Sequence, residues 1–147
     1  MYCHTFPAGS LKTYKYVVVL SEHNGALLLS RHRQRSTWET QGGHIEAGET
    51  PLEAAKRELY EESGAVVYDI RVGFDYRAGD ENGSANGMVF LADIHTLGPI
   101  PDSEMREVRT FDALPSDDAL TYPGITPILY RHAKKSCLHS KLCSRPE

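Results

Sequence analysis

The sequence predicts a single mixed α/β domain. Three observations support this class: apolar β-prone runs recur along the chain, one central segment carries both the start and the stop signals of a helix, and no internal repeat or linker interrupts the 147 residues. A chain of 16.4 kDa is long enough to close one hydrophobic core. We therefore expect one domain over residues 1–135 and a polar tail over residues 136–147, which is a candidate for disorder.

The first predicted element is an antiparallel hairpin. Residues 15–20 (KYVVVL) and 26–31 (ALLLSR) are apolar and β-prone, and Asn24-Gly25 between them is a strong signal for a tight turn. The polar, glycine-rich segment that follows, residues 32–49, is typical of a loop.

The central helix has well-marked ends. Thr50 is suited to the N-cap, Pro51 to the first helical position, and Glu53, three residues after the cap, completes a capping box. Gly64 is placed to stop the helix. The apolar residues within it recur at helical spacing and predict a face that docks on a sheet: Leu52, Ala55 and Leu59.

The second half of the chain adds three strands and a helix. Residues 66–78 and 87–97 are predicted as two longer strands, with residues 80–86 (DENGSAN) as a flexible connection. Residues 107–115 indicate a short strand that runs into a turn. Residues 126–135 predict a C-terminal helix with basic residues in its last turns.

Three glutamates crowd the end of the central helix. In RELYEESG, Glu58, Glu61 and Glu62 are spaced three and four residues apart and share one face, where each like-charged pair costs roughly 0.2–0.5 kcal/mol. The negative end of the helix dipole adds to the repulsion. This face adjoins the apolar stripe and can therefore line a cleft. Either a cation gathers these carboxylates or they form an ordinary solvated face.

The segment GHIEAGETPLEAAKRELYEESGA, residues 43–65, resembles the Nudix box, G-x5-E-x7-R-E-U-x-E-E-x-G-U, where U is a bulky aliphatic residue. Only Ala65 departs from this pattern, being smaller than the usual last residue. The resemblance implies a Nudix-type α/β/α sandwich with a central mixed β-sheet and a loop-helix-loop at the box. The residues in agreement are Gly43, Glu49, Arg57, Glu58, Leu59, Glu61, Glu62 and Gly64.

By this resemblance, the box holds a divalent metal ion, Mg²⁺ or alternatively Mn²⁺. Hard cations of this kind select carboxylate and carbonyl oxygens. The implied ligands are the carboxylates of Glu58, Glu61 and Glu62 and the backbone carbonyl of Gly43. Glu58 and Glu61 are also implied in catalysis, and Glu58 in water activation. Arg57 and Glu49 are expected to form an internal ion pair that orients the loop and the helix.

A further carboxylate is often drawn from a later loop in this family. The segment PDSEMREVRTF offers Glu104 first and Glu107 second, although both could equally be surface residues. We expect Glu104 to take part in catalysis or metal binding.

Four other residues are candidates for substrate binding. Arg31 and Arg33 match phosphate oxygens through their guanidinium groups, and the alternative is an ordinary basic surface loop that also contains Arg35. Trp38 can stack on a base or serve as a packing anchor. His44 can touch the ligand or shape its loop.

The implied activity is hydrolysis of a phosphoanhydride in a small-molecule, nucleoside diphosphate-linked substrate. The lead-in ETQGGHIEAGET is most similar to MutT-type members, so an oxidised nucleoside triphosphate such as 8-oxo-dGTP is the first expectation. Alternatives are ADP-ribose or a nucleotide sugar as substrate, an enzyme similar to isopentenyl diphosphate isomerase, and a non-catalytic ligand sensor.

Composition limits the remaining classes. A formal net charge of −4 argues against a general grip on nucleic-acid backbones, and no apolar run approaches the roughly 20 residues that span a bilayer. We expect a soluble cytoplasmic protein, either a monomer or a homodimer, without nucleic-acid or membrane partners. Cys3, Cys137 and Cys143 are expected as free thiols; a zinc site of Cys137, His139 and Cys143 lacks the usual ligand spacing.

Overall fold

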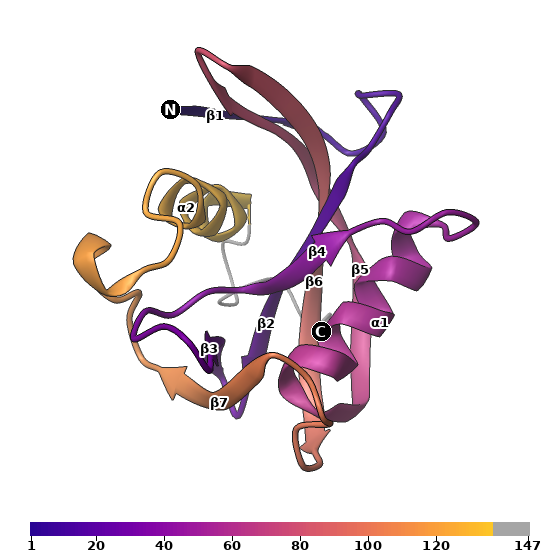
Figure 1. Cartoon of the computed structure of the whole chain (residues 1–147). Coiled ribbons are helices and arrows are strands. Elements are labelled where there is room, and N and C mark those ends of the chain that lie inside the picture. The colour runs from indigo at the N-terminus through magenta and orange to yellow at the C-terminus, as the bar shows by residue number, and fades with distance from the viewer. Residues whose placement is uncertain (137–147) are drawn as a thin grey trace.

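The computed structural model describes residues 1–136, which form one mixed sheet between two helices (Figure 1). Within these residues, seven strands follow the order β1-β5-β6-β2-β3-β7, with β4 paired to β2. The strands are β1 (Tyr2–Pro7), β2 (Tyr16–His23), β3 (Ala26–His32), β4 (Gln41–His44), β5 (Ala65–Asp80), β6 (Gly83–Leu97) and β7 (Met105–Phe111). The helices are α1 (Pro51–Ser63), α2 (Thr126–Ser136) and a short 3₁₀ turn, η1 (Asp117–Ala119).

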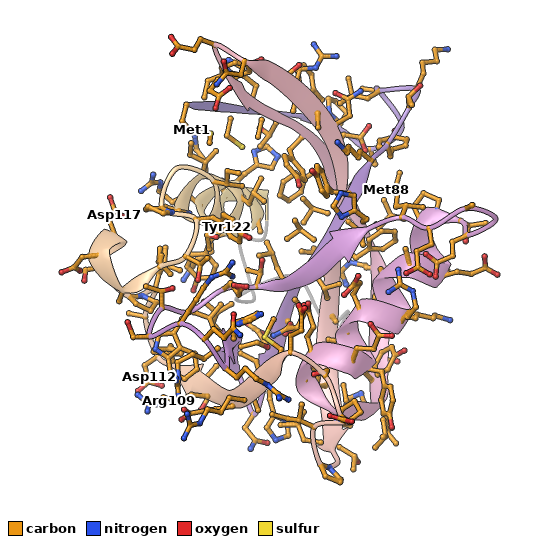
Figure 2. All side chains as sticks on the ribbon, viewed as in Figure 1. Met1, Met88, Arg109, Asp112, Asp117 and Tyr122 are labelled. Atoms are coloured by element: carbon orange, nitrogen blue, oxygen red, sulfur yellow. The ribbon has the colours of Figure 1, made fainter. Side chains whose placement is uncertain are left out.

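The two long helices cover opposite faces of the sheet. Ala54, Ala55 and Leu59 of α1 pack on one face in a cluster with Val19 and Phe90. The other face carries a second cluster, to which α2 contributes the side chains of Leu129, Tyr130 and Ala133. Side chains fill the space between the sheet and both helices (Figure 2). The predicted α/β/α sandwich with a central mixed sheet is therefore confirmed.

The mixed character of the sheet comes from one parallel pair. β2 runs parallel to β6, with Val19 beside Phe90, whereas the other strand pairs are antiparallel. This parallel pair places β2 and β4 at the centre of the molecule, against α1.

Both ends of α1 agree with the sequence prediction. The Glu53 amide donates to the Thr50 hydroxyl at 3.1 Å, and the Thr50 amide donates to Glu53 Oε1 at 2.9 Å, which completes the capping box. Gly64 ends the helix in the left-handed region at φ 80°, and a Cβ there would lie 2.5 Å from the Gly98 carbonyl oxygen. Only glycine fits this position.

Two strands were not predicted, and one connection was predicted wrongly. β1 is a short edge strand that depends on pairing with β5, and β4 is the glycine-rich QGGH inside the predicted loop. Neither segment carries the apolar alternation that identifies a strand. Residues 80–86 are mostly the end of one long β5–β6 hairpin, because cross-strand pairing reaches Asp80 and Gly83. β7 begins and ends earlier than predicted, at residues 105 and 111.

The predicted polar tail, residues 136–147, lies almost entirely outside the residues that the structure describes. α2 reaches Ser136, and the rest of the predicted tail, with Cys137, His139 and Cys143, lies outside the described residues. Cys3 is buried in β1 as a free thiol, and burial raises its pKa to about 11. Neither helix of residues 1–136 has the length and apolar character that a bilayer crossing requires.

Candidate active site

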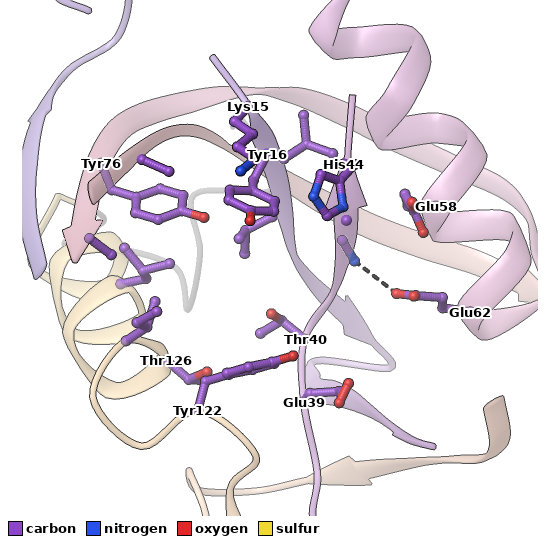
Figure 3. A pocket seen from close by; sticks show the side chains of 18 of the residues that line it. Lys15, Tyr16, Glu39, Thr40, His44, Glu58, Glu62, Tyr76, Tyr122 and Thr126 are labelled. Carbon is purple, nitrogen blue, oxygen red and sulfur yellow. Dashed lines mark hydrogen bonds between the residues drawn. The ribbon is translucent and has the colours of Figure 1, made fainter. Parts of the chain in front are cut away.

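A large cleft of about 1240 Å³ is lined by residues of the sheet and of both long helices. Its walls come from the start of β2, from β4, from the C-terminal half of α1, from the β5–β6 hairpin and from the start of α2. Residues 102–105, ahead of β7, line it as well. Figure 3 shows Glu58 and Glu62 on one wall of the cleft, with Tyr16, Tyr76 and Tyr122 around the space beside them.

The helix carboxylates meet the two glycines of β4. The Gly42 amide donates a hydrogen bond to Glu62 Oε1 at 2.8 Å (Figure 3). A Cβ on Gly43 would lie 2.3 Å from a carboxylate oxygen of Glu58. The missing side chain at Gly43 is thus what lets the Glu58 carboxylate approach the β4 backbone.

The ionised forms of Glu58 and Glu62 are disfavoured by their position in the cleft wall. Burial raises the pKa of Glu62 to about 9, against the hydrogen bond from Gly42, and the charges of Glu58 and Glu39 raise it further. The pKa of Glu58 is also raised, mainly by burial, although Arg57 opposes the shift. Two carboxylates that resist ionisation while lining a cleft mark a site that gains from a nearby cation.

Arg57 contacts both the loop before α1 and the acidic side chains of α1. Its Nε and Nη2 atoms hold both oxygens of Glu49 at 2.6 and 3.0 Å, and Nη2 also donates to the His44 carbonyl at 3.1 Å. Nη1 reaches Glu58 at 3.1 Å and Glu61 at 3.3 Å. The hydrogen bonds from Arg57 lower the pKa of Glu49 to about 2. One guanidinium therefore ties the loop to the helix and neutralises part of the acidic face.

The donor set at this junction fits a divalent cation. The carboxylates of Glu58, Glu61 and Glu62 and the Gly43 carbonyl are the hard oxygen donors that Mg²⁺ prefers. Within residues 1–136, no three His, Cys, Asp or Glu side chains are already gathered tightly enough to hold a metal ion. Arg57 Nη1 instead lies against two of the carboxylates.

The two later carboxylates differ in their surroundings. Glu104 lines the cleft with 85% of its side chain exposed, and its carboxylate lies 3.5 Å from His32 Nε2. Glu107 does not line the cleft. Its carboxylate accepts a hydrogen bond from Arg31 at 2.7 Å, and this contact is the main cause of its lowered pKa. The geometry favours Glu104 over Glu107 as a group that can act in the cleft.

The predicted substrate-binding residues separate into two groups. His44 lines the cleft, where its ring tilts against that of Tyr16 at 4.6 Å. Arg31 is held by Glu107, and Arg33 lies in a small hollow beside Asp102 and Ser103; neither lines the main cleft.

The position of Trp38 agrees with a role as a packing anchor and not with stacking on a base. The ring is 8% exposed and packs edge-to-face on Phe111 at 5.2 Å. Its backbone also pairs with residues 119–121, which draws the ring into the core cluster on the α2 side of the sheet.

Several cleft residues were missed by sequence reasoning. Arg35, named only within a basic loop, lines the cleft and contacts the buried Glu39 at 3.1 Å. Tyr16 and Tyr122 line it too, and Tyr122 is 49% exposed. Tyr122 follows Thr121, whose amide donates to the Trp38 carbonyl, so its position depends on a pairing between distant segments. No local pattern could have predicted this position.

This geometry belongs to a known class. The family model described as "NUDIX domain" matches residues 13–129, so the chain belongs to the Nudix family. The prediction of the family is confirmed, and with it the class of a Nudix hydrolase at the level of the family. Proteins of this family generally use divalent metal ions such as Mg²⁺.

The chain is also similar to particular curated proteins over part of its length. The chain is 36% identical over 55 residues to an RNA pyrophosphohydrolase of Francisella philomiragia, covering 37% of this chain and 36% of that protein. It is 39% identical over 56 residues to the RNA pyrophosphohydrolase of Aliivibrio fischeri, covering 38% and 32%. These alignments thus span only about a third of the length of the curated relatives.

One solved structure is similar over nearly the whole chain. A pyrophosphohydrolase of Bacillus subtilis superposes with a TM-score of 0.79 at 25% identity, covering 92% of both chains. The NUDIX domain of NrtR from Shewanella oneidensis, solved with ADP-ribose, superposes with a TM-score of 0.57 at 16% identity over 70% of this chain and 75% of that one. The second likeness supports the fold alone.

Proposed function

We propose that this chain is a divalent-metal-dependent pyrophosphohydrolase that cleaves a phosphoanhydride bond in a nucleoside 5′-triphosphate group. The observation that carries the proposal is the partly buried pair of Glu58 and Glu62 on the cleft wall, held against Gly42 and Gly43. Such a pair is unfavourable when it is ionised without a cation, and a dication with a polyphosphate would compensate it.

The roles of the residues follow from their places. Glu58, Glu61, Glu62 and the Gly43 carbonyl would hold the ion, which supplies charge neutralisation of the phosphate oxygens and a more acidic bound water. Arg57 keeps the carboxylates oriented through its two contacts with Glu49.

Glu104 is the proposed general base. Its exposed carboxylate lines the same cleft and can accept a proton from water at either oxygen. His32 Nδ1 accepts a hydrogen bond from the Gln34 amide, which leaves its Nε2–H directed at Glu104. Glu58 is the alternative base.

The leading candidate substrate is the 5′-triphosphate end of an RNA. The curated relatives quoted above are named RNA pyrophosphohydrolases, and the cleft exceeds the roughly 300–1,000 Å³ of ordinary small-ligand pockets. This proposal departs from the expectation of no nucleic-acid partner. It needs only the first nucleotides of a strand and no basic track along the backbone.

An oxidised nucleoside triphosphate such as 8-oxo-dGTP is the second candidate. The net charge of −4 favours it, because a free nucleotide requires no wider attraction to a polyanion.

A substrate panel tests the proposal. Triphosphorylated RNA oligomers, unmodified and oxidised nucleoside triphosphates, ADP-ribose, a nucleotide sugar and isopentenyl diphosphate are each incubated with Mg²⁺, with Mn²⁺ or with EDTA. We expect metal-dependent release of pyrophosphate or phosphate from the RNA first. Metal-dependent turnover of 8-oxo-dGTP alone would select the second candidate. Binding without turnover of any compound would favour a ligand sensor and contradict the proposal.

A further inference from the structure

The cleft has more acidic than basic side chains. Carboxylates line it from α1, from the loops on either side of β4, from the β5–β6 hairpin and from residues 102–104. Among residues 1–136, the lysine and arginine residues that line it are Lys15, Arg35 and Arg57. A polyphosphate carries several negative charges, so a substrate of the proposed kind gains from each cationic contact in addition to a bound ion.

Two of these three cations are already paired within the chain. Arg57 is held by glutamates of α1 and of the loop before it, and Arg35 Nη1 lies 3.1 Å from Glu39. Within residues 1–136, Lys15 forms no ion pair, and its Nζ lies 5.5 Å from the centroid of the Tyr16 ring. A contact with the face of a ring leaves the three N–H donors of an ammonium group available to a ligand.

The backbone of Lys15 is held from two sides. Its amide donates to the Asn86 carbonyl at 2.9 Å, and its carbonyl accepts from the Ile45 amide at 2.9 Å. The Asn86 side chain is fixed in turn, because its Nδ2 donates to the Thr13 carbonyl and its Oδ1 accepts from Arg77 Nε, both at 2.9 Å. Three segments of the chain therefore set the point from which the lysine side chain starts.

This point lies close to the acidic junction of β4 and α1. The register of β2 with β4 places Val17 opposite Gly43, and Lys15 comes two residues before Val17. Two residues of a strand span about 6–7 Å. In Figure 3, the side chains of Lys15, His44 and Glu58 all lie along the upper edge of the cleft. A polyphosphate held at the α1 carboxylates can therefore extend toward Lys15.

We propose that Lys15 binds a phosphate group of the substrate, next to the phosphate that is held at the α1 carboxylates. This inference rests on the proposed function. The ammonium group donates to phosphate oxygens and adds a positive charge where carboxylates dominate. Because this phosphate is not the one at the metal site, the contact contributes to substrate binding more than to the chemical step, and its loss raises KM more than it lowers kcat.

Binding of a methylene-bridged triphosphate analogue, which is not hydrolysed, tests this contact. Its affinity is measured by calorimetry with Mg²⁺ for the natural chain, Lys15→Gln, Lys15→Arg and Lys12→Gln. We expect Lys15→Gln to raise Kd by about tenfold or more, because it removes a hydrogen bond from a charged donor. Lys15→Arg keeps the charge and should stay within about threefold of the natural chain. Lys12→Gln is the matched control, since Lys12 is exposed and does not line the cleft, and its affinity should be unchanged.

Salt separates an electrostatic contact from a structural role. The difference in Kd between the natural chain and Lys15→Gln should shrink from about 0.05 M to about 0.5 M NaCl, because salt screens exposed charges. A difference that salt does not change, or that Lys15→Arg does not repair, would overturn the inference. Equal affinity of Lys15→Gln and the natural chain would overturn it as well, and so would a natural chain that does not bind the analogue.

The substrate panel is scored separately from this binding experiment. Absence of metal-dependent turnover in the natural chain would contradict the proposed function. Metal-dependent turnover by the natural chain, together with an unchanged KM and an unchanged Kd in Lys15→Gln, would contradict only the role of Lys15.

Discussion

The two walls of the cleft are built in different ways. The wall formed by α1 and β4 comes from one continuous segment, and its parts are joined by short contacts such as Arg57 with Glu49 at 2.6 Å and Gly42 with Glu62 at 2.8 Å. The facing surface gathers Tyr16, Tyr76 and Tyr122 from β2, β5 and the loop before α2. On the proposed function, the first wall would hold the metal ion and the second would recognise the substrate, while the proposed base, Glu104, lies on neither wall. Variants of the two walls should therefore affect different kinetic constants.

The largest effect is expected on the α1 wall. Glu62→Gln keeps the hydrogen bond from Gly42 but removes a charge from the proposed metal site, so kcat should fall by about 10²–10⁴-fold. Turnover of the best panel substrate measures the loss. Glu81→Gln, in the exposed hairpin turn, is the matched control and should retain full activity. Natural turnover in Glu62→Gln would remove this residue from the mechanism.

The next effect tests the close approach at β4. In Gly43→Ala the new methyl group would lie 2.3 Å from the Glu58 carboxylate and displace it. We expect Mg²⁺ affinity, followed by calorimetry, to fall by about tenfold to a hundredfold, as for other changes that disturb ligand orientation. Gly98→Ala is the control, because its Cβ would lie at an ordinary 3.5 Å from the nearest atom. Equal Mg²⁺ binding by both variants would contradict the role of this gap.

A smaller effect concerns stability without metal. Because the folded-state pKa of Glu62 is raised to about 9, its contribution to stability is complete below the unfolded pKa near 4.5 and is lost as the pH rises toward 9. In EDTA, Glu62→Gln should therefore be more stable than the natural chain at pH 8, by roughly 1–3 kcal/mol. Urea unfolding at pH 8 and at pH 4 measures both limits. If the difference in unfolding free energy between the two proteins is as large at pH 4 as at pH 8, the raised pKa of Glu62 is not its cause.

The smallest effect is expected on the aromatic wall. Tyr122→Ala should raise KM by about tenfold with little change in kcat, since stacking of a base on an aromatic ring contributes about 1–3 kcal/mol. Tyr60→Ala is a close control, because Tyr60 is 46% exposed on α1 and does not line the cleft. Inhibition by base-free tripolyphosphate should be the same in both variants. A fall in kcat without a rise in KM would contradict the assignment of Tyr122 to substrate binding.

The same division explains what the sequence could predict. The α1 wall was predictable because capping signals, glutamate spacing and the glycines all lie within residues 41–64. β4 itself was missed, since two of its four residues are glycine and its pairing with β2 comes from the fold. Arg31 and Trp38 were assigned to the substrate because proximity in sequence does not reveal the direction of a side chain.

The aromatic wall lay beyond local patterns. Tyr122 reaches the cleft through the backbone pairing of residues 119–121 with Trp38, more than eighty positions earlier in the chain. Tyr76 packs beside Gly87 of the next strand, where a Cβ would meet its ring at 2.3 Å. The placement of Tyr122 depends on long-range contacts that one sequence alone does not display, whereas Tyr76 and Gly87 pair within the single β5–β6 hairpin.

The guanidinium of Arg57 has a consequence for how the acidic turn keeps its arrangement. With Nη1 resting on Glu58 and Glu61 and its other nitrogens anchored to Glu49 and His44, the acidic turn carries a built-in counterion. The junction of loop and helix can accordingly hold its arrangement through charge pairing within the chain itself. On the proposed function, a bound ion would join this arrangement and would not have to create it.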